Sequence, residues 1–133
     1  MIFSIICLAE AIYFEARNQP QAGQLAVGHV VMNRVASQQY PDNPCDVIKQ
    51  GRYWLHIPIK HQCQFSYYCD GLKEIIRDKP AYGQAVINAA AIYYQWIPDN
   101  TNGATHYHAD YVQPSWAVKD PAIIINKHLF YRL

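Results

Sequence analysis

Between residues 5 and 16 the apolar side chains recur at steps of three and four, which is the pattern of a helix with one buried side. No other stretch of the chain restricts its fold as strongly. The apolar stripe consists of Ile5, Leu8, Ala9, Ile12 and Ala16. We therefore predict a helix here that packs this face against the rest of the protein.

The composition favours one folded unit. The chain has 133 residues, of which 51% are hydrophobic and 16% charged, with a net charge of +1. A chain of this length can bury roughly two-thirds of its unfolded surface, so we expect a single domain over residues 1–133. The low charge argues against disorder, and no apolar run reaches the ~18 residues of a membrane-spanning helix. Basic residues are scattered and nearly balanced by acidic ones, which disfavours binding to nucleic acid.

The first nine residues are apolar but have no positively charged flank, and Glu10 interrupts them. We interpret them as part of the fold, so export would depend on another protein or on a segment outside this sequence. Of the four cysteines, Cys7 is expected to be a buried thiol. Cys63 and Cys69 can close a small loop in an oxidising compartment, with Cys45 as a competing partner. Their spacing is not that of a zinc site, and no metal is expected.

The remaining elements follow from caps, breakers and alternation. Helices are predicted at residues 20–36, 45–50, 72–77 and 80–96. Residues 52–71 are irregular and rich in aromatic side chains, which predicts a long loop with one short strand. Extended segments are predicted at residues 105–109, 122–125 and 128–131. The fold class is therefore α+β, mainly helical, with a small antiparallel sheet near the C-terminus.

The two glutamates of the first helix lie on different sides of it. With Leu8 set at zero and about 100° per residue, Glu10 falls at about 200°, opposite the stripe, and Glu15 at about −20°, on its edge. A carboxyl group held against apolar neighbours is desolvated, which raises its pKa toward the value that a general acid needs at neutral pH. The alternative is a boundary carboxylate that pairs with Arg17 or Arg34.

Several blocks of sequence carry a family resemblance. The first lie around and after Glu15, at residues 8–17 (LAEAIYFEAR), 23–27 (GQLAV) and 30–35 (VVMNRV). Later blocks are residues 64–66 (QFS), 69–71 (CDG), 103–108 (GATHYH) and 128–131 (HLFY), with Pro114 and Trp116. Together they resemble the cell wall hydrolases of the SleB type, the catalytic domain of the spore cortex-lytic enzyme family. Because the blocks span nearly the whole chain in order, the resemblance is specific.

The resemblance implies a lysozyme-like or transglycosylase-like fold and a single catalytic domain. It also implies cleavage of the β-1,4 bond between N-acetylmuramic acid and N-acetylglucosamine in peptidoglycan. The glutamate of the family's Glu-Ala-Arg block is catalytic, and here it is Glu15. No cofactor is implied.

The chain contains only three glutamates, which bears on the mechanism. Retaining and inverting glycosidases generally use two carboxylates. A lytic transglycosylase can use one, which protonates the leaving oxygen and then deprotonates the muramic 6-hydroxyl to give a 1,6-anhydro product. We therefore favour a lytic transglycosylase. A muramidase-type hydrolase is the alternative, with Asp70, Asp99 or Asp110 as the second carboxylate.

The family blocks also suggest residues that bind substrate, which are Gln64, Phe65, Ser66, Thr105, Tyr107, His108 and Trp116. The alternatives are a plain packing loop at residues 64–66 and a core role for Trp116. Tyr107 is expected to point toward the sugar or toward Glu15. On an extended strand His106 and His108 share one face, so a metal-dependent amidase is a further alternative. A non-catalytic peptidoglycan-binding homologue is another.

We expect the protein to act as a monomer on peptidoglycan glycan strands, outside the cytoplasm. A bare catalytic domain suits a phage lysin that a partner delivers to the cell wall, and it equally suits a bacterial domain.

Overall fold

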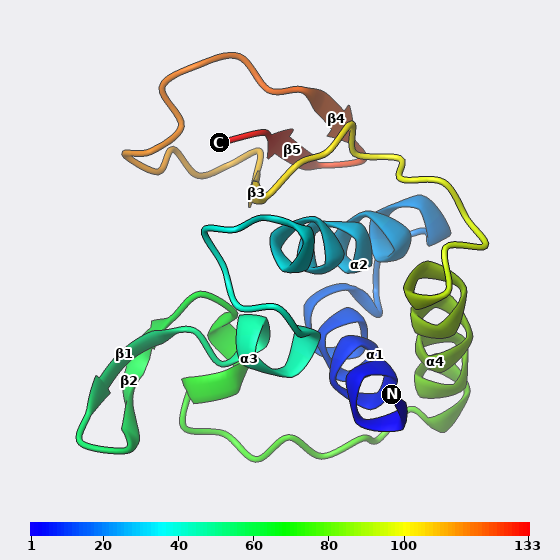
Figure 1. The fold of residues 1–133 in the computed structure, drawn as a ribbon, viewed down its shortest axis with the longest axis vertical. Helices are drawn as coiled ribbons and strands as arrows, with labels where there is room; N and C mark the ends of the chain where they lie inside the picture. Colours follow the sequence, from blue (N-terminus) through cyan, green and yellow to red (C-terminus); the bar gives the residue numbers. More distant parts are fainter.

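A computed structural model describes residues 1–133. Figure 1 shows helices packed around α1, a small sheet above α2, and a hairpin that projects from the helical part. The elements in chain order are α1 (Ile2–Ala16), α2 (Gln21–Ala36), α3 (Pro44–Ile48), β1 (Gly51–Trp54), β2 (Ile57–Cys63), the 3₁₀ helix η1 (Ser66–Cys69), α4 (Lys79–Tyr93), β3 (His106–Ala109), β4 (Ile123–Ile125) and β5 (His128–Tyr131). The predicted α+β class is confirmed.

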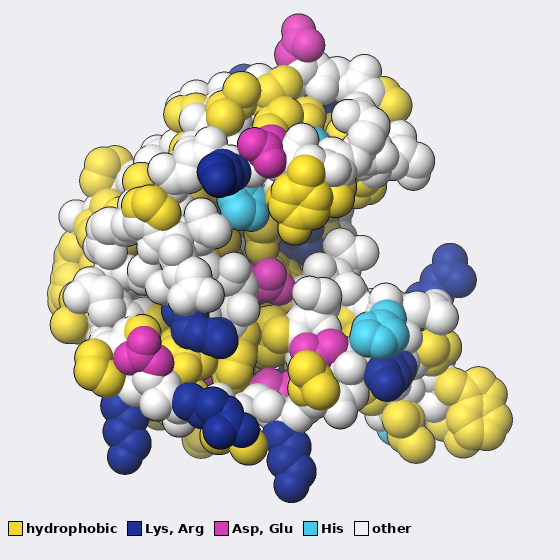
Figure 2. Space-filling view, turned by 180° about the vertical axis from the view of Figure 1, so that it is seen from behind, with side chains coloured by type: hydrophobic (Ala, Val, Ile, Leu, Met, Phe, Trp, Pro, Cys, Tyr) yellow, Lys and Arg dark blue, Asp and Glu magenta, His cyan; other side chains and the backbone are white.

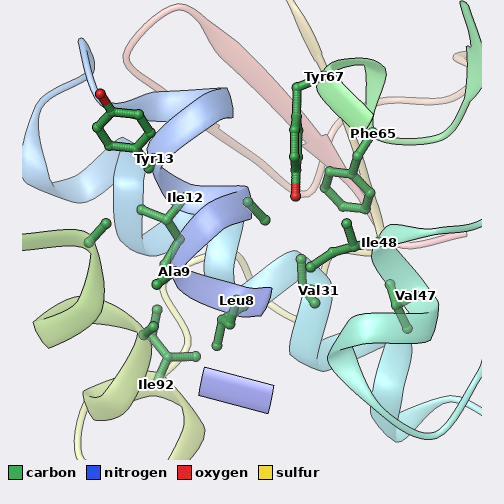
Figure 3. Close-up of a cluster of buried hydrophobic side chains, with 13 residues drawn as sticks. Leu8, Ala9, Ile12, Tyr13, Val31, Val47, Ile48, Phe65, Tyr67 and Ile92 are labelled. Carbon is green, nitrogen blue, oxygen red and sulfur yellow. The ribbon is translucent and has the colours of Figure 1, made fainter. Parts of the chain in front are cut away.

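Helix α1 is central, with contacts to α2, α3 and α4. Its predicted stripe is the core: Leu8, Ala9, Ile12 and Ala16 are buried, and Ile5 packs at the edge. Figure 3 shows the surrounding cluster, to which Val31, Val47, Ile48, Phe65, Tyr67 and Ile92 contribute from other elements. Each large apolar side chain buried here contributes about 1.5–3 kcal/mol relative to exposure.

The three long helices approach closely at Gly28 of α2. A β-carbon at this position would lie 2.5 Å from Cδ1 of Ile92 in α4 and 3.1 Å from Cδ1 of Ile12 in α1. The missing side chain of glycine leaves the space that these two isoleucines fill.

Side-chain caps explain where two helices begin. The Asn43 side chain accepts a hydrogen bond from the Asp46 amide at 2.9 Å, at the start of α3. The Asp78 side chain accepts one from the Ala81 amide at 3.0 Å, and Pro80 occupies the first turn of α4.

The helix predicted at residues 72–77 is wrong. This segment has no helical hydrogen bonds, and its Leu72 and Ile75 side chains are 72% and 47% exposed. A six-residue segment has too few hydrogen bonds to offset helix nucleation without a buried face. The Tyr13 hydroxyl instead accepts hydrogen bonds from the amides of Arg77 and Asp78, at 3.2 and 3.0 Å.

The C-terminal sheet is antiparallel, as predicted, and its strand order is β3–β5–β4. Tyr107 of β3 pairs with Phe130 of β5, and Ile123 of β4 pairs with the same residue. The sheet packs on α2 through a second small core of Ala26, Val30, Ala104, Ile125 and Phe130. Strand β3 pairs only with β5, so β5 holds β3 in place.

Residues 52–71 hold more structure than predicted, because β1 and β2 form an antiparallel hairpin. Its turn places Leu55 at φ 57° and has no glycine or asparagine, which are the usual signals for such a turn. Strand β1 is exposed along its whole length, so neither strand shows clear alternation.

Two disulfides are present. Cys63 and Cys69 form the expected small loop. The prediction of a buried thiol at Cys7 is wrong, because α3 lies beside α1 and brings Cys7 and Cys45 to a Cα–Cα distance of 5.2 Å, where they form a disulfide. None of the helices combines the length and the apolar character that a membrane crossing requires.

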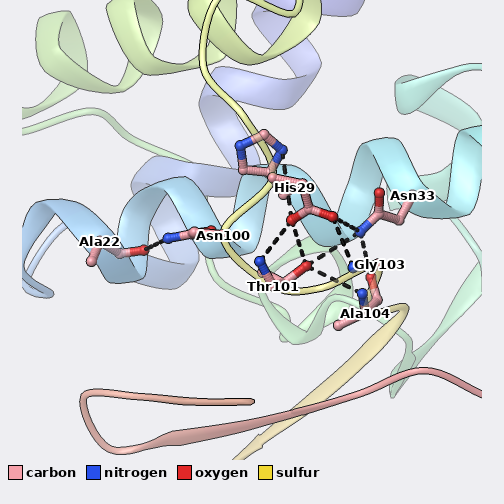
Figure 4. Close-up of polar contacts among 8 residues, drawn as sticks. Ala22, His29, Asn33, Asn100, Thr101, Gly103 and Ala104 are labelled. Carbon is pink, nitrogen blue, oxygen red and sulfur yellow. Dashed lines mark hydrogen bonds and ion pairs between the residues drawn. The ribbon is translucent and has the colours of Figure 1, made fainter. Parts of the chain in front are cut away.

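A polar turn before β3 is held against α2 by hydrogen bonds (Figure 4). The Asp99 carboxylate accepts hydrogen bonds from the Thr101 amide, the Thr101 hydroxyl and the Gly103 amide, at 2.7–2.9 Å. The Asn33 side chain of α2 donates to Asp99 and to the Ala104 carbonyl, both at 2.9 Å. These bonds fix the turn that precedes β3 against α2.

Candidate active site

A pocket of about 230 Å³ opens beside Glu15, which lies near the C-terminal end of α1. Figure 2 shows the molecule deeply hollowed on one side, with acidic, basic, histidine and apolar side chains around the hollow. The pocket is lined by Glu15 of α1, Arg34 of α2, Gln64, Phe65 and Ser66 of the disulfide loop, His106 and Tyr107 of β3, and Trp116. Segments far apart in the sequence therefore meet at one carboxyl group.

Burial changes the acidity of Glu15. It raises the pKa of this carboxyl to about 7, while interaction with the Tyr107 hydroxyl lowers it in part. The one ion pair of the structure joins His29 to Asp99, so no arginine lies within 4.0 Å of Glu15. The alternative of an ion pair with Arg17 or Arg34 is therefore not observed. Arg17 instead stacks over the Tyr13 ring at 4.9 Å.

Tyr107 is fixed by the sheet. Its ring stacks on Phe130 with 5.4 Å between ring centroids. Burial, together with the nearby Glu15 carboxyl, raises the pKa of Tyr107 well above its usual value. The phenol therefore stays protonated and can donate a hydrogen bond to Glu15 or to a ligand.

The Cys63–Cys69 disulfide encloses residues 64–66. Within this loop Phe65 is buried in the core, whereas Gln64 and Ser66 are exposed. The Gln64 amide donates to the Gln50 carbonyl at 2.9 Å, which ties the loop to the segment before β1. The buried ring thus anchors two polar side chains at the edge of the pocket.

Trp116 reaches the pocket from the segment after β3. Its ring packs against His106 at 5.1 Å and edge-on against Tyr131 at 5.4 Å. It therefore lines the pocket and contacts the sheet aromatics at the same time.

Thr105 and His108, which were also predicted to bind substrate, do not line the Glu15 pocket. The Thr105 hydroxyl contacts Nδ1 of His106 at 3.0 Å. Nε2 of His108 contacts the Tyr131 hydroxyl at 2.8 Å, and Nδ1 contacts the Ala109 carbonyl at 2.7 Å. Both side chains are buried and form hydrogen bonds within the fold. The His108 ring also packs against the ring of Trp116.

Sequence reasoning missed Arg34 and His106 as pocket residues. Arg34 follows Val30 and Val31 by four and three residues, so it lies on the buried side of α2, which is an unusual place for arginine. That position was the available signal. His106 was considered only as a possible metal ligand.

The structure provides no donor set for the metal-dependent alternative. Both ring nitrogens of His108 are hydrogen-bonded, and no three His, Cys, Asp or Glu side chains gather as a metal site would require.

No second carboxylate lines the Glu15 pocket. Asp70 lines a neighbouring hollow and caps the Leu72 amide at 2.8 Å. Asp110 is exposed beyond β3. Burial acts to raise the pKa of Asp99, but hydrogen bonds from Thr101, Asn33 and Gly103 outweigh it and leave that pKa lowered.

Two further hollows lie near the pocket. One of about 600 Å³ shares Gln64 and His106 with it and reaches Arg52 at the base of the hairpin. Another of about 420 Å³ is lined by Phe14 and Tyr67, whose stacked rings are the chain neighbours of Glu15 and Ser66. The first hollow thus adjoins the Glu15 pocket, and the second lies at the stacked rings of Phe14 and Tyr67.

Comparison with known proteins places the chain in a family. Residues 18–131 match the family described as Cell Wall Hydrolase. The chain belongs to the cell wall hydrolase family. It is 34% identical over 125 residues to the spore cortex-lytic enzyme of Halalkalibacterium halodurans, covering 92% of this chain and 33% of that protein. It is 30% identical over 124 residues to that of Bacillus cereus, covering 92% and 42%. The chain spans less than half the length of these relatives.

Solved structures of this cell wall hydrolase family share the fold. The catalytic domain of the Bacillus cereus SleB protein matches with a TM-score of 0.73 and 28% identity, over 99% of this chain and 91% of that one. The catalytic domain of the germination-specific lytic transglycosylase SleB from Bacillus anthracis matches with a TM-score of 0.71 and 29% identity, over 97% and 93%. The predicted SleB-type resemblance is confirmed. The family match begins after Glu15, whereas the first structural match covers α1 as well.

Proposed function

We propose that this chain degrades peptidoglycan by cleaving the β-1,4 bond between N-acetylmuramic acid and N-acetylglucosamine, as a lytic transglycosylase. The observation that carries the proposal is one desolvated carboxyl group, Glu15, with a pKa of about 7 in a pocket that no second carboxylate lines. Family membership and the name of the Bacillus anthracis relative support it. The protein acts as a monomer on glycan strands outside the cytoplasm.

In the first step, protonated Glu15 donates its proton to the glycosidic oxygen as the bond to the muramic anomeric carbon breaks. In the second, the Glu15 carboxylate takes the proton of the muramic 6-hydroxyl. The 6-oxygen then bonds to the anomeric carbon and closes the 1,6-anhydro ring. Glu15 ends protonated, so one residue completes the cycle, and no water is consumed.

The other pocket residues bind and orient the sugar. The Tyr107 hydroxyl lowers the pKa of Glu15, and Gln64 and Ser66 offer hydrogen bonds to hydroxyl and acetamido groups. The ring of Trp116 forms an apolar wall against which a sugar ring packs, and the buried ring of Phe65 keeps Gln64 and Ser66 at the edge of the pocket.

Digestion of purified cell walls tests the proposal by mass spectrometry of the released fragments. Anhydro-muramic ends are expected, whereas reducing muramic ends would indicate hydrolysis and freed peptides an amidase. Glu15→Gln should abolish release. Glu10→Gln, on the same helix but outside the pocket, is the matched control and should retain it. Full activity of Glu15→Gln would refute the role of Glu15, and no release by the wild-type protein would indicate a binding module.

A further inference from the structure

The guanidinium of Arg34 is buried without an opposite charge. The residue is only 5% exposed, and no carboxylate lies within 4.0 Å of it, because the one ion pair of the structure joins His29 to Asp99. Burial of an unpaired charge costs free energy unless hydrogen bonds compensate it. The protein supplies only part of that compensation.

One nitrogen of the guanidinium has a hydrogen-bond acceptor and another has none. Nε donates a hydrogen bond to the Thr105 carbonyl at 2.7 Å. Nη1 is buried and has no hydrogen-bond partner. The rings of Tyr40 and Phe65 lie 5.1 and 5.6 Å from the guanidinium carbon and stabilise its charge, but they offer no acceptor in the guanidinium plane. A donor therefore remains without an acceptor.

This side chain forms part of the wall of the Glu15 pocket. Burial and the Arg34 charge together lower the pKa of His106, which keeps the neighbouring ring neutral near pH 7. Arg34 is thus the one permanent cation of the pocket.

We propose that Arg34 binds substrate by donating a hydrogen bond to an amide carbonyl oxygen of the sugar beside Glu15. This inference rests on the proposed function. Since Glu15 must reach the glycosidic oxygen, the groups that reach Arg34 in the same pocket are substituents of nearby ring carbons. In peptidoglycan these are the N-acetyl group at C2 and the lactyl amide at C3 of muramic acid. Both present a carbonyl oxygen, which a guanidinium binds strongly.

Arg34 could have a purely structural role, which would be to connect α2 to the start of β3. A variant of Asn33 serves as the control for that role. Asn33 is the preceding residue of the same helix, and its side chain donates to the Ala104 carbonyl at 2.9 Å, next to the Thr105 carbonyl that Arg34 contacts. Asn33 does not line the Glu15 pocket. Its loss weakens the same connection without removing a pocket donor.

The test measures binding in a Glu15→Gln background, so that substrate is not consumed. Arg34→Gln, Arg34→Lys and Asn33→Ala are added to it, and each dissociation constant is compared with that of the Glu15→Gln parent. Three insoluble substrates are used: intact cell walls, N-deacetylated walls, and walls from which an amidase has removed the stem peptides. Circular dichroism at the binding temperature verifies that each variant is folded.

On intact walls Arg34→Gln should weaken binding roughly 10- to 100-fold and Asn33→Ala less than about threefold. Arg34→Lys should recover part of the loss, because lysine keeps the positive charge but lacks the planar set of N–H donors of a guanidinium. If the acceptor is the N-acetyl group, the Arg34→Gln loss disappears on N-deacetylated walls. If it is the lactyl group, the loss grows on peptide-free walls, where a carboxylate replaces the amide. An equal effect on all three substrates, or an equal loss from Asn33→Ala, overturns the inference.

Failure of the proposed function would look different. If the Glu15→Gln parent still cleaved walls, the role of Glu15 would fall, whereas the substrate dependence of the Arg34 variants would still report on Arg34.

Discussion

The Tyr107 hydroxyl and the Glu15 carboxyl interact across the pocket, so a residue of strand β3 adjusts the acidity of a residue of helix α1. Burial raises the pKa of Glu15 to about 7, and the contact with Tyr107 acts in the opposite direction. A carboxyl poised near neutral pH can donate a proton in one step and accept one in the next.

Replacement of Tyr107 should therefore raise the pKa of Glu15. Tyr107→Phe keeps the stacking on Phe130 but removes the interaction that lowers the pKa of Glu15. We expect the alkaline side of the pH–rate profile for cell wall release to shift to higher pH. Tyr131→Phe is the control, because its hydroxyl contacts His108 and not the pocket. A shift to lower pH in Tyr107→Phe would contradict the assignment.

The raised pKa of Glu15 also predicts how stability depends on pH. The pKa is 4.5 when unperturbed and about 7 in the folded protein, so between these values the folded state binds more protons than the unfolded state. The contribution of Glu15 to stability is therefore present at pH 4 and is lost as the pH rises through 7, by on the order of 3 kcal/mol.

Glu15→Gln does not titrate, so it should gain stability relative to the wild type as the pH rises from 4 to 8. Urea unfolding of both proteins across this range measures the difference. A difference that stays constant with pH would show that Glu15 has an ordinary pKa.

Removal of one disulfide should mainly lower stability, and removal of the other should mainly lower activity. Their cysteines are 38 and 6 residues apart in sequence. On loop entropy, the loss of Cys7–Cys45 should cost about 4 kcal/mol and the loss of Cys63–Cys69 about 2 kcal/mol. The second disulfide holds the pocket residues Gln64, Phe65 and Ser66 in a short loop, whereas Glu15 and Arg34, which lie within the longer loop of the first, are held by helices α1 and α2. A Cys63→Ser, Cys69→Ser protein should therefore lose more specific activity at 25 °C than a Cys7→Ser, Cys45→Ser protein, despite melting higher. The reverse order of activity would count against a role for the small loop in shaping the pocket.

Two glycines should respond oppositely to an added side chain. Gly28→Val places atoms where Ile92 and Ile12 pack, and should cost about 1–3 kcal/mol of stability. A β-carbon added to Gly83 of α4 would meet no atom within 4 Å, so Gly83→Ala should stabilise by up to about 1 kcal/mol. Thermal unfolding measures both, and a stabilised Gly28→Val would mean that the helices are less tightly packed there.

Much of the fold was predictable because the signals are local. The stripe of α1, and the caps at Asn43 and Asp78, act within a few residues of where they stand. The β1–β2 hairpin lacks such signals, since its turn at Leu55 has no glycine and its strands have no buried face. Cys7 was misassigned for a different reason, because its partner is set by the packing of α3 on α1.

The pocket was predictable in part. Glu15 and the residues of the disulfide loop came from a resemblance in sequence blocks, and the structure brings them together with Tyr107 and Trp116. The alternation of β3 alone does not show that Tyr107 lines the pocket whereas Thr105 and His108 do not, because side chains pack against both faces of this strand. Arg34 is positioned by a carbonyl 71 residues away, a contact that no local pattern encodes.

The pairing of β3 with β5 alone affects when the pocket can form during synthesis. Glu15 leaves the ribosome long before β5, but the strand that carries Tyr107 gains its only partner once His128–Tyr131 has emerged. A nascent chain that has not reached this point contains the acid without the wall that faces it. The complete pocket therefore forms only after the last strand has been made.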